Sequence, residues 1–186
     1  MKSLTFAASA QFTSDPLSSS GDAGKAGAYF ESEGSLMALL SDAESVEGSG
    51  SVYKAVLPMS SFPGINVKST NFFNVDRSED SLSIELLNST STATGPRFLV
   101  SIFEASQATP PKTTSFNKIS VVGDDGAAPR LQSDVSLEIV MEMPNWIPIP
   151  LATLEKRGSE ALEKLLDNDV KPKLSVLKSK LAAFSP

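Results

Sequence analysis

The chain has 186 residues, of which 40% are hydrophobic, and a formal net charge of −6. This length predicts one domain with a substantial core, and the acidic balance argues against nucleic acid as a main partner. Cysteine and histidine are both absent, which excludes disulfides, thiolate metal sites and Ser-His catalysis.

The N-terminal stretch predicts a strand, because apolar residues alternate with polar or small ones from Leu4 to Phe12. The same alternation makes it a poor signal peptide, and no apolar run approaches the ~18 residues of a membrane span. Residues 14–28 are rich in Ser, Gly and Asp and predict a flexible loop. A short helix is expected over 28–42, weakened by Gly34.

Strand signals dominate the middle of the chain. Residues 65–75 and the alternating stretch 82–86 flank a polar turn and predict an antiparallel hairpin. Short strands are also expected at 51–58, 97–105 and 116–122. If 97–105 is a strand, either Phe98 and Val100 face inward, or Leu99 and Phe103 do.

The clearest strand runs from Arg130 to Met143. One face is apolar and the other is mostly acidic or polar, which is typical of an antiparallel sheet with one face on a core and one in water. The apolar face consists of Val135, Leu137, Ile139, Met141 and Met143.

A proline-rich corner, 144–150, separates this strand from a leucine-striped segment that reaches Phe184. Prolines lack the N–H that strand pairing needs, so the chain is expected to leave the sheet here and turn back across it. Trp146 could then close one end of the space between helix and sheet. Pro172 predicts a kink, or a break into two helices.

The order of elements is strand, helical segment, about six strands and a long helix, which predicts an α+β class. We expect a helix-grip arrangement: a curved antiparallel sheet of six to seven strands covered by the C-terminal helix, in a single domain over 1–186.

These features resemble the helix-grip superfamily of START, Bet v 1 and polyketide-cyclase proteins. More narrowly, the chain from Leu36 to Phe184 resembles the plastid and cyanobacterial family called domain of unknown function nineteen ninety-seven. The resemblance rests on the strand "LQSDVSLEIVMEMP", the corner "WIPIP" and the helix start "LEKRG". The sequence departs from that family at 14–28 and at Pro172. The resemblance implies a chloroplast location, stromal or thylakoid-associated, and a lipid or pigment-like ligand, with no catalytic residues.

Two interpretations of the apolar strand face stay open: it lines a ligand cavity, or it belongs to a filled core. The leading hypothesis is non-enzymatic binding of an apolar or amphipathic small molecule between sheet and helix, with no cofactor or metal. The predicted ligand-binding residues are Phe98, Val100, Leu137, Ile139, Met141, Trp146, Leu154, Leu162 and Leu165.

Two other functions are compatible with the sequence. The protein could be an accessory subunit docked on a photosynthetic membrane complex, or an enzyme of the cyclase or hydratase kind. The carboxylate pairs Asp124-Asp125 and Glu138/Glu142 are interpreted as a turn and a solvated strand face. The four lysines after position 170 are interpreted as favourable charges near a helix C-terminus, with anionic lipid or an acidic protein as the alternative.

Overall fold

The computed structural model describes residues 2–18, 20–62, 65–106, 111–123, 128–143 and 150–185. In chain order its elements are β1 (Lys2–Thr13), α1 (Ser20–Glu31), α2 (Glu33–Leu39), β2 (Ser45–Ser49), β3 (Val52–Val56), β4 (Ser60–Phe62), β5 (Ile65–Arg77), β6 (Ser81–Thr94), α3 (Arg97–Ser106), β7 (Lys112–Val122), β8 (Arg130–Met143) and α4 (Leu151–Ala183).

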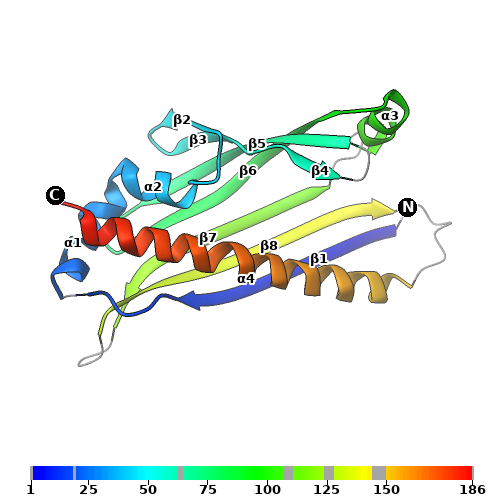
Figure 1. Cartoon of the computed structure of the whole chain (residues 1–186). Coiled ribbons are helices and arrows are strands. Elements are labelled where there is room, and N and C mark those ends of the chain that lie inside the picture. The colour runs from blue at the N-terminus through cyan, green and yellow to red at the C-terminus, as the bar shows by residue number, and fades with distance from the viewer. Residues whose placement is uncertain are drawn as a thin grey trace.

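The predicted α+β class is confirmed. Seven strands form one antiparallel sheet in the order β1-β8-β7-β6-β5-β3-β2, and the short β4 pairs with β5. The long helix α4 runs along this sheet, with α1 and α2 near its C-terminal end and α3 at the far end of the sheet (Figure 1). The arrangement is helix-grip-like. Among the described residues, no helix is long and apolar enough to cross a membrane.

The β1–β8 pair brings two segments that are far apart in the sequence together into one apolar face. In the antiparallel register, Leu4 lies opposite Met141, and Phe6 lies opposite Ile139. Because side chains alternate along both strands, every second pair points to the same side. The predicted strand 130–143 and its apolar face are therefore confirmed, and Glu138 on the other face is exposed.

The predicted hairpin is also confirmed as β5 and β6, but it contains a β-bulge. Phe73 lies opposite Leu86, whereas Phe72 lies opposite Asn88, so Leu87 is an extra residue on β6. A one-residue insertion reverses the side to which later residues point. Beyond the bulge, Ser89 rather than Asn88 therefore shares the face of Phe73.

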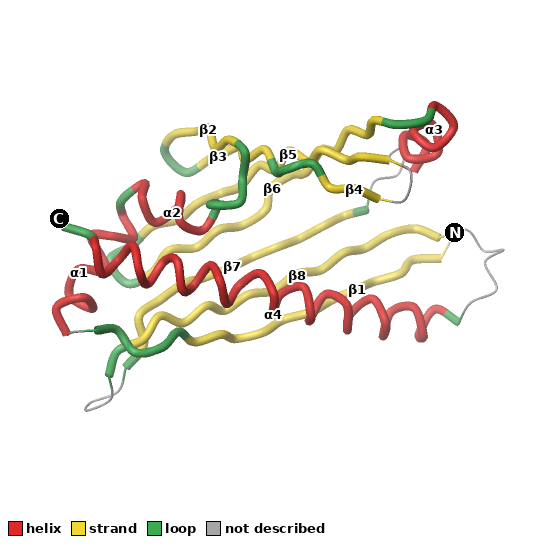
Figure 2. The backbone as a smooth tube through the Cα atoms, in the orientation of Figure 1, coloured by secondary structure: helices red, strands yellow, loops and turns green. Residues whose placement is uncertain are grey.

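The sheet forks between β6 and β7. Their ladder runs only from Ser81↔Ser120 to Glu85↔Phe116. Beyond it, β6 pairs only with β5 and β7 only with β8 among the described residues. Figure 2 shows the two strands separating toward the end that carries α3. The sheet is thus continuous at one end and divided at the other.

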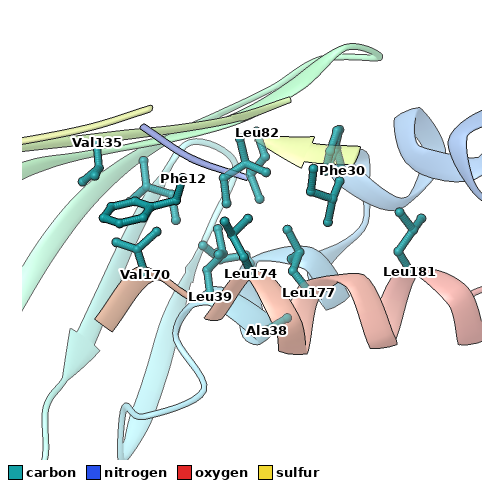
Figure 3. Packing of buried hydrophobic residues seen from close by; sticks show 14 of the residues in the cluster. Phe12, Phe30, Ala38, Leu39, Leu82, Val135, Val170, Leu174, Leu177 and Leu181 are labelled. Atoms are coloured by element: carbon teal, nitrogen blue, oxygen red, sulfur yellow. The ribbon is translucent and has the colours of Figure 1, made fainter. Parts of the chain in front are cut away.

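One face of the C-terminal half of α4 is buried in the core. Its apolar stripe lies against the sheet and α2, and Leu177 and Leu181 have no exposed surface (Figure 3). Burying such a side chain contributes about 1.5–3 kcal/mol. The stripe consists of Leu166, Val170, Leu174, Leu177 and Leu181.

The N-terminal half of α4 is attached to the edge strand β1. The backbone amide of Thr5 donates to the Glu155 carboxylate (3.1 Å), and that of Ala7 donates to the Ser159 hydroxyl (3.1 Å). These bonds satisfy groups that an edge strand would otherwise leave unpaired. Between them, Gly158 lies directly against the ring of Phe6.

Of the two outcomes predicted at Pro172, the break into two helices is wrong, since α4 continues through this position, and the kink stays a prediction. Pro172 cannot donate a hydrogen bond to Asn168, one turn earlier. Both residues are exposed, so water can satisfy that carbonyl. Burial of Leu174 and Leu177 on the following turn holds the helix together.

The predicted loop over 14–28 is wrong from Ser20 onward, where α1 begins. The stretch before α1 is tied to the sheet, because the amide of Leu17 donates to the Pro129 carbonyl (2.8 Å) and the Leu17 side chain is buried. Burial of this segment outweighs its loop-like composition.

Glycine in α1 serves packing. A Cβ at Gly27 would lie 2.8 Å from the backbone oxygen of Glu79, so this glycine allows α1 to approach the β5–β6 turn. The helix buries Ala26, Tyr29 and Phe30. This burial offsets the low helix propensity of glycine, which is about 1 kcal/mol below that of alanine.

The predicted strand over 97–105 is also wrong, because these residues form α3. Their apolar residues recur three and four positions apart as well as two, so the pattern fits either element. Pro96 favours the helix, because its carbonyl accepts hydrogen bonds from the amides of Leu99 (3.0 Å) and Val100 (3.1 Å). Proline is favourable at the start of a helix.

The strand β2 was not predicted. Gly50 has a φ of +67°, which L residues rarely adopt, and makes the tight turn from β2 into β3. Gly48 and Ser49 are the last residues of β2, and Gly50 begins the turn.

Substitution of two helical glycines by alanine should have opposite effects. Alanine at Gly24, where nothing lies within 4 Å, should stabilise the protein by about 0.5–1 kcal/mol. Gly158→Ala should destabilise it by about 1–2 kcal/mol, because the new methyl group overlaps the Phe6 ring. Urea unfolding measures both; equal stabilisation would contradict the close packing of α4 on β1.

Tyr29 should make stability depend on alkaline pH. Its ring is buried and lies 5.3 Å from that of Phe184, and burial raises the pKa of Tyr29 to about 12. The unfolded tyrosine ionises near pH 10, so the contribution is complete below about pH 10 and is lost as pH rises toward 12.

The measurement compares the unfolding free energy of wild type and Tyr29→Phe at about pH 9 and about pH 11. The advantage of the wild type should shrink at the higher pH. A difference that is independent of pH would show that the Tyr29 phenol ionises normally.

Candidate ligand-binding cavity

A cavity of about 430 Å³ lies between α4, the end of α2 and the inner face of the sheet. It spans the fork, because Leu86 and Ser89 line it from β6, and Thr113 and Ser115 line it from β7. Its volume is within the range of about 300–1,000 Å³ typical of small-molecule sites.

One side of the cavity is apolar. Aliphatic side chains come from α4, the end of α2 and strands β6 and β8, and the aromatic side chain of Phe73 comes from β5. Leu165 lines this side and is 53% exposed, although it belongs to a helix packed on the sheet. The apolar lining consists of Leu39, Leu40, Leu57, Phe73, Ile84, Leu86, Val135, Leu137, Leu165, Leu166 and Val170.

The sheet side carries a polar strip across three neighbouring strands. Asn71 accepts a hydrogen bond from Ser89 (2.7 Å), and Asn117 accepts one from the buried Ser133 (2.7 Å). These contacts orient the two amides beside the cavity. The strip consists of Ser69, Asn71, Ser89, Thr113, Ser115 and Asn117.

An ion-pair cluster connects two elements beside the cavity. The Lys173 ammonium on α4 lies 3.3 Å from the carboxylate of Asp42, which follows α2, and 3.0 Å from that of Asp169. The Lys173 side chain is 22% exposed, whereas both carboxylates are about half exposed. The cluster holds α4 against the end of α2.

Two predicted ligand-binding residues, Leu137 and Leu165, line the cavity. Leu162 is half-buried and packs against the core. Ile139, Met141 and Leu154 are also half-buried, but they lie nearer the proline-rich corner and do not line this cavity.

The other three predicted residues lie elsewhere. Phe98 and Val100 are on α3, at the far end of the sheet, and Phe98 is 74% exposed. Their placement differs from the expected one because this segment forms a helix and not a strand. Trp146 lies outside the described residues.

Sequence reasoning missed the polar strip. Its signal was present, because alternate residues of β5 read Val67, Ser69, Asn71, Phe73 and Val75, with polar positions inside an apolar face. The remaining polar positions depend on the bulge at Leu87 and on the start of β7 at Lys112, which composition does not reveal.

The other charged candidates do not enter the cavity lining. Glu138 and Glu142 are exposed, as predicted for a solvated face, while Asp124 and Asp125 lie outside the described residues. Within the described ranges, no group of three or more acidic side chains is arranged to hold a metal ion.

No protein-family model matches the chain, and no curated protein matches it. Similar solved structures include truncated norcoclaurine synthase from Thalictrum flavum, at 12% identity over 100% of this chain and 98% of that one, with a TM-score of 0.48. Others are a conserved protein from Geobacillus kaustophilus (13%, 98% and 96%, 0.48) and a START superfamily protein from Mycobacterium smegmatis (10%, 94% and 99%, 0.41).

At these values the likeness concerns the overall arrangement of sheet and helix and carries no residue role to this chain. Membership of the narrower plastid family stays a prediction.

Removal of the Lys173 charge should destabilise the protein. Lys173→Met leaves Asp42 and Asp169 without their shared cation, so we expect a loss of about 0.5–1 kcal/mol, smaller in about 1 M NaCl. The control is Lys156→Met, because Lys156 is 79% exposed and 4.0 Å from Glu160; it should change stability little. Equal effects in urea unfolding would show that the cluster adds nothing.

Proposed function

We propose that the protein binds an apolar or amphipathic small molecule in the cavity between the sheet and α4, without chemical turnover. The observation that carries the proposal is the apolar lining beside the fork. Leu137 and Leu165 both line this space. Leu137 is half-buried, and Leu165 is 53% exposed.

Hydrophobic burial would supply the affinity. Each Å² of apolar surface removed from water contributes about 25 cal/mol. An apolar ligand would cover the exposed part of Leu165 and the half-buried side chains of Phe73, Leu86 and Leu137. The space lies next to the solid core, so these walls are held in place before the ligand arrives.

A binding role fits the ionisable groups of the cavity better than a catalytic one. Asp42, Asp169 and Lys173 are paired with one another. General acid-base catalysis needs a group free to exchange a proton with the substrate, and these three side chains have a structural role between α2 and α4.

A docking role is the second candidate. Phe98 on α3 is 74% exposed, and α3 packs mainly on β6. An exposed aromatic on a peripheral helix suits attachment to a larger complex, which the family resemblance would locate in a plastid. Size-exclusion of a cell extract should then show a heavy fraction that Phe98→Asp abolishes.

The binding proposal is tested with the uncharged fluorophore N-phenyl-1-naphthylamine, whose emission rises in an apolar site. Ser115 lines the cavity, whereas Thr92 is exposed on β6 and lines neither the cavity nor the hollow beside it. Ser115→Phe should fill the site and weaken binding by about tenfold or more, while Thr92→Phe should leave it unchanged.

Thermal unfolding of both variants checks that the fold is intact. If the wild-type protein fails to bind the fluorophore, or if folded Ser115→Phe binds as tightly as the wild type, the proposal is wrong.

A further inference from the structure

We propose that the ligand of this cavity is uncharged and presents oxygen acceptors, such as carbonyl, ether or hydroxyl oxygens, to the polar strip. The inference rests on the proposed function and specifies the chemical class that the site selects.

The polar strip has an excess of hydrogen-bond donors. The side-chain oxygens of Asn71 and Asn117 are occupied by the hydroxyls of Ser89 and Ser133. Each amide group also carries two N–H donors, and these have no partner among the described residues. The two asparagines therefore present N–H groups to the cavity.

Two hydroxyls add to this strip. Thr113 and Ser115 line the cavity from β7 and are half-buried. Their side chains form no hydrogen bond with any described residue. A pure hydrocarbon would cover these groups and leave them without a partner, at a cost of about 1–3 kcal/mol each, whereas a ligand with acceptor oxygens would bond to them.

The fork also exposes backbone N–H and C=O groups. The β6 ladder to β7 ends at Glu85, and β7 from Lys112 to Ser115 pairs with no described strand on this side. The adjoining hollow at this point is lined by Glu85, Ser115 and Phe116, among other residues, and shares Ser115 and Leu137 with the cavity. Polar groups of the chain thus continue along the opening.

The charges of the site disfavour ionic head groups. One cation, Lys173, already serves both Asp42 and Asp169, so the lining carries a net charge of one minus two, or −1. A carboxylate ligand would meet a negative surplus and no unpaired cation in the lining. An ammonium ligand would have to displace Lys173. An uncharged ligand avoids both costs.

The test uses three amphiphiles with the same alkyl chain, each displacing N-phenyl-1-naphthylamine at neutral pH below the concentration at which it aggregates. Monolaurin is neutral and carries ester and hydroxyl oxygens, laurate is anionic and dodecylamine is cationic. Monolaurin should displace the fluorophore at a concentration lower by about fivefold or more than the other two. Equal or tighter binding of either charged amphiphile overturns the inference.

Isosteric variants test the contribution of the strip. Thr113→Val removes one hydroxyl without changing shape and should weaken monolaurin binding by about threefold to tenfold, while N-phenyl-1-naphthylamine binding should not weaken. Thr92→Val, on an exposed position of β6 outside the cavity and the adjoining hollow, is the matched control and should change neither. Equal monolaurin affinity in wild type and Thr113→Val would overturn the role of that hydroxyl.

The two proposals fail in different ways. The proposed function is wrong if the wild type does not bind the fluorophore, or if Ser115→Phe leaves fluorophore binding intact. The present inference alone is wrong if Ser115→Phe blocks fluorophore binding but the wild type does not prefer monolaurin to the charged amphiphiles.

Discussion

The attachment of α4 at two different places governs this structure. Its C-terminal half is held by apolar burial of Leu174, Leu177 and Leu181 in the core. Its N-terminal half is held by the edge of β1, where Gly158 meets Phe6 and two side chains accept backbone hydrogen bonds. A helix fixed at the core and at an edge leaves a space between its middle part and the inner sheet face, and the cavity lies there.

The elements predicted well from sequence are those in which one periodicity is unopposed. β8 alternates over its whole length, and the β5–β6 hairpin has a polar turn between two alternating runs. α1 and α3 were missed for another reason. Glycines obscure α1, whose formation depends on burial of Tyr29 and Phe30, and the spacing in α3 suits both a helix and a strand.

The candidate site was only partly predictable for related reasons. Leu137 and Leu165 belong to long regular stripes, so periodicity identifies them. Asn71, Ser115 and Asn117 are polar residues on an inward face, which composition alone assigns to the surface. Their location follows from strand register, and register depends on pairings between residues far apart in the chain. The ion pairs of Lys173 likewise join distant segments.

The extra residue at Leu87 has a consequence for how this cavity can vary. Because β6 changes side at that point, its inward residues are the aliphatic Ile84 and Leu86 before the bulge and the hydroxyl-bearing Ser89 after it, and all three line the cavity. One backbone irregularity thus sets where the lining changes from apolar to polar along this strand. Substitutions beyond the bulge would alter the polar part of the lining and leave Leu82, which is fully buried in the core, in place.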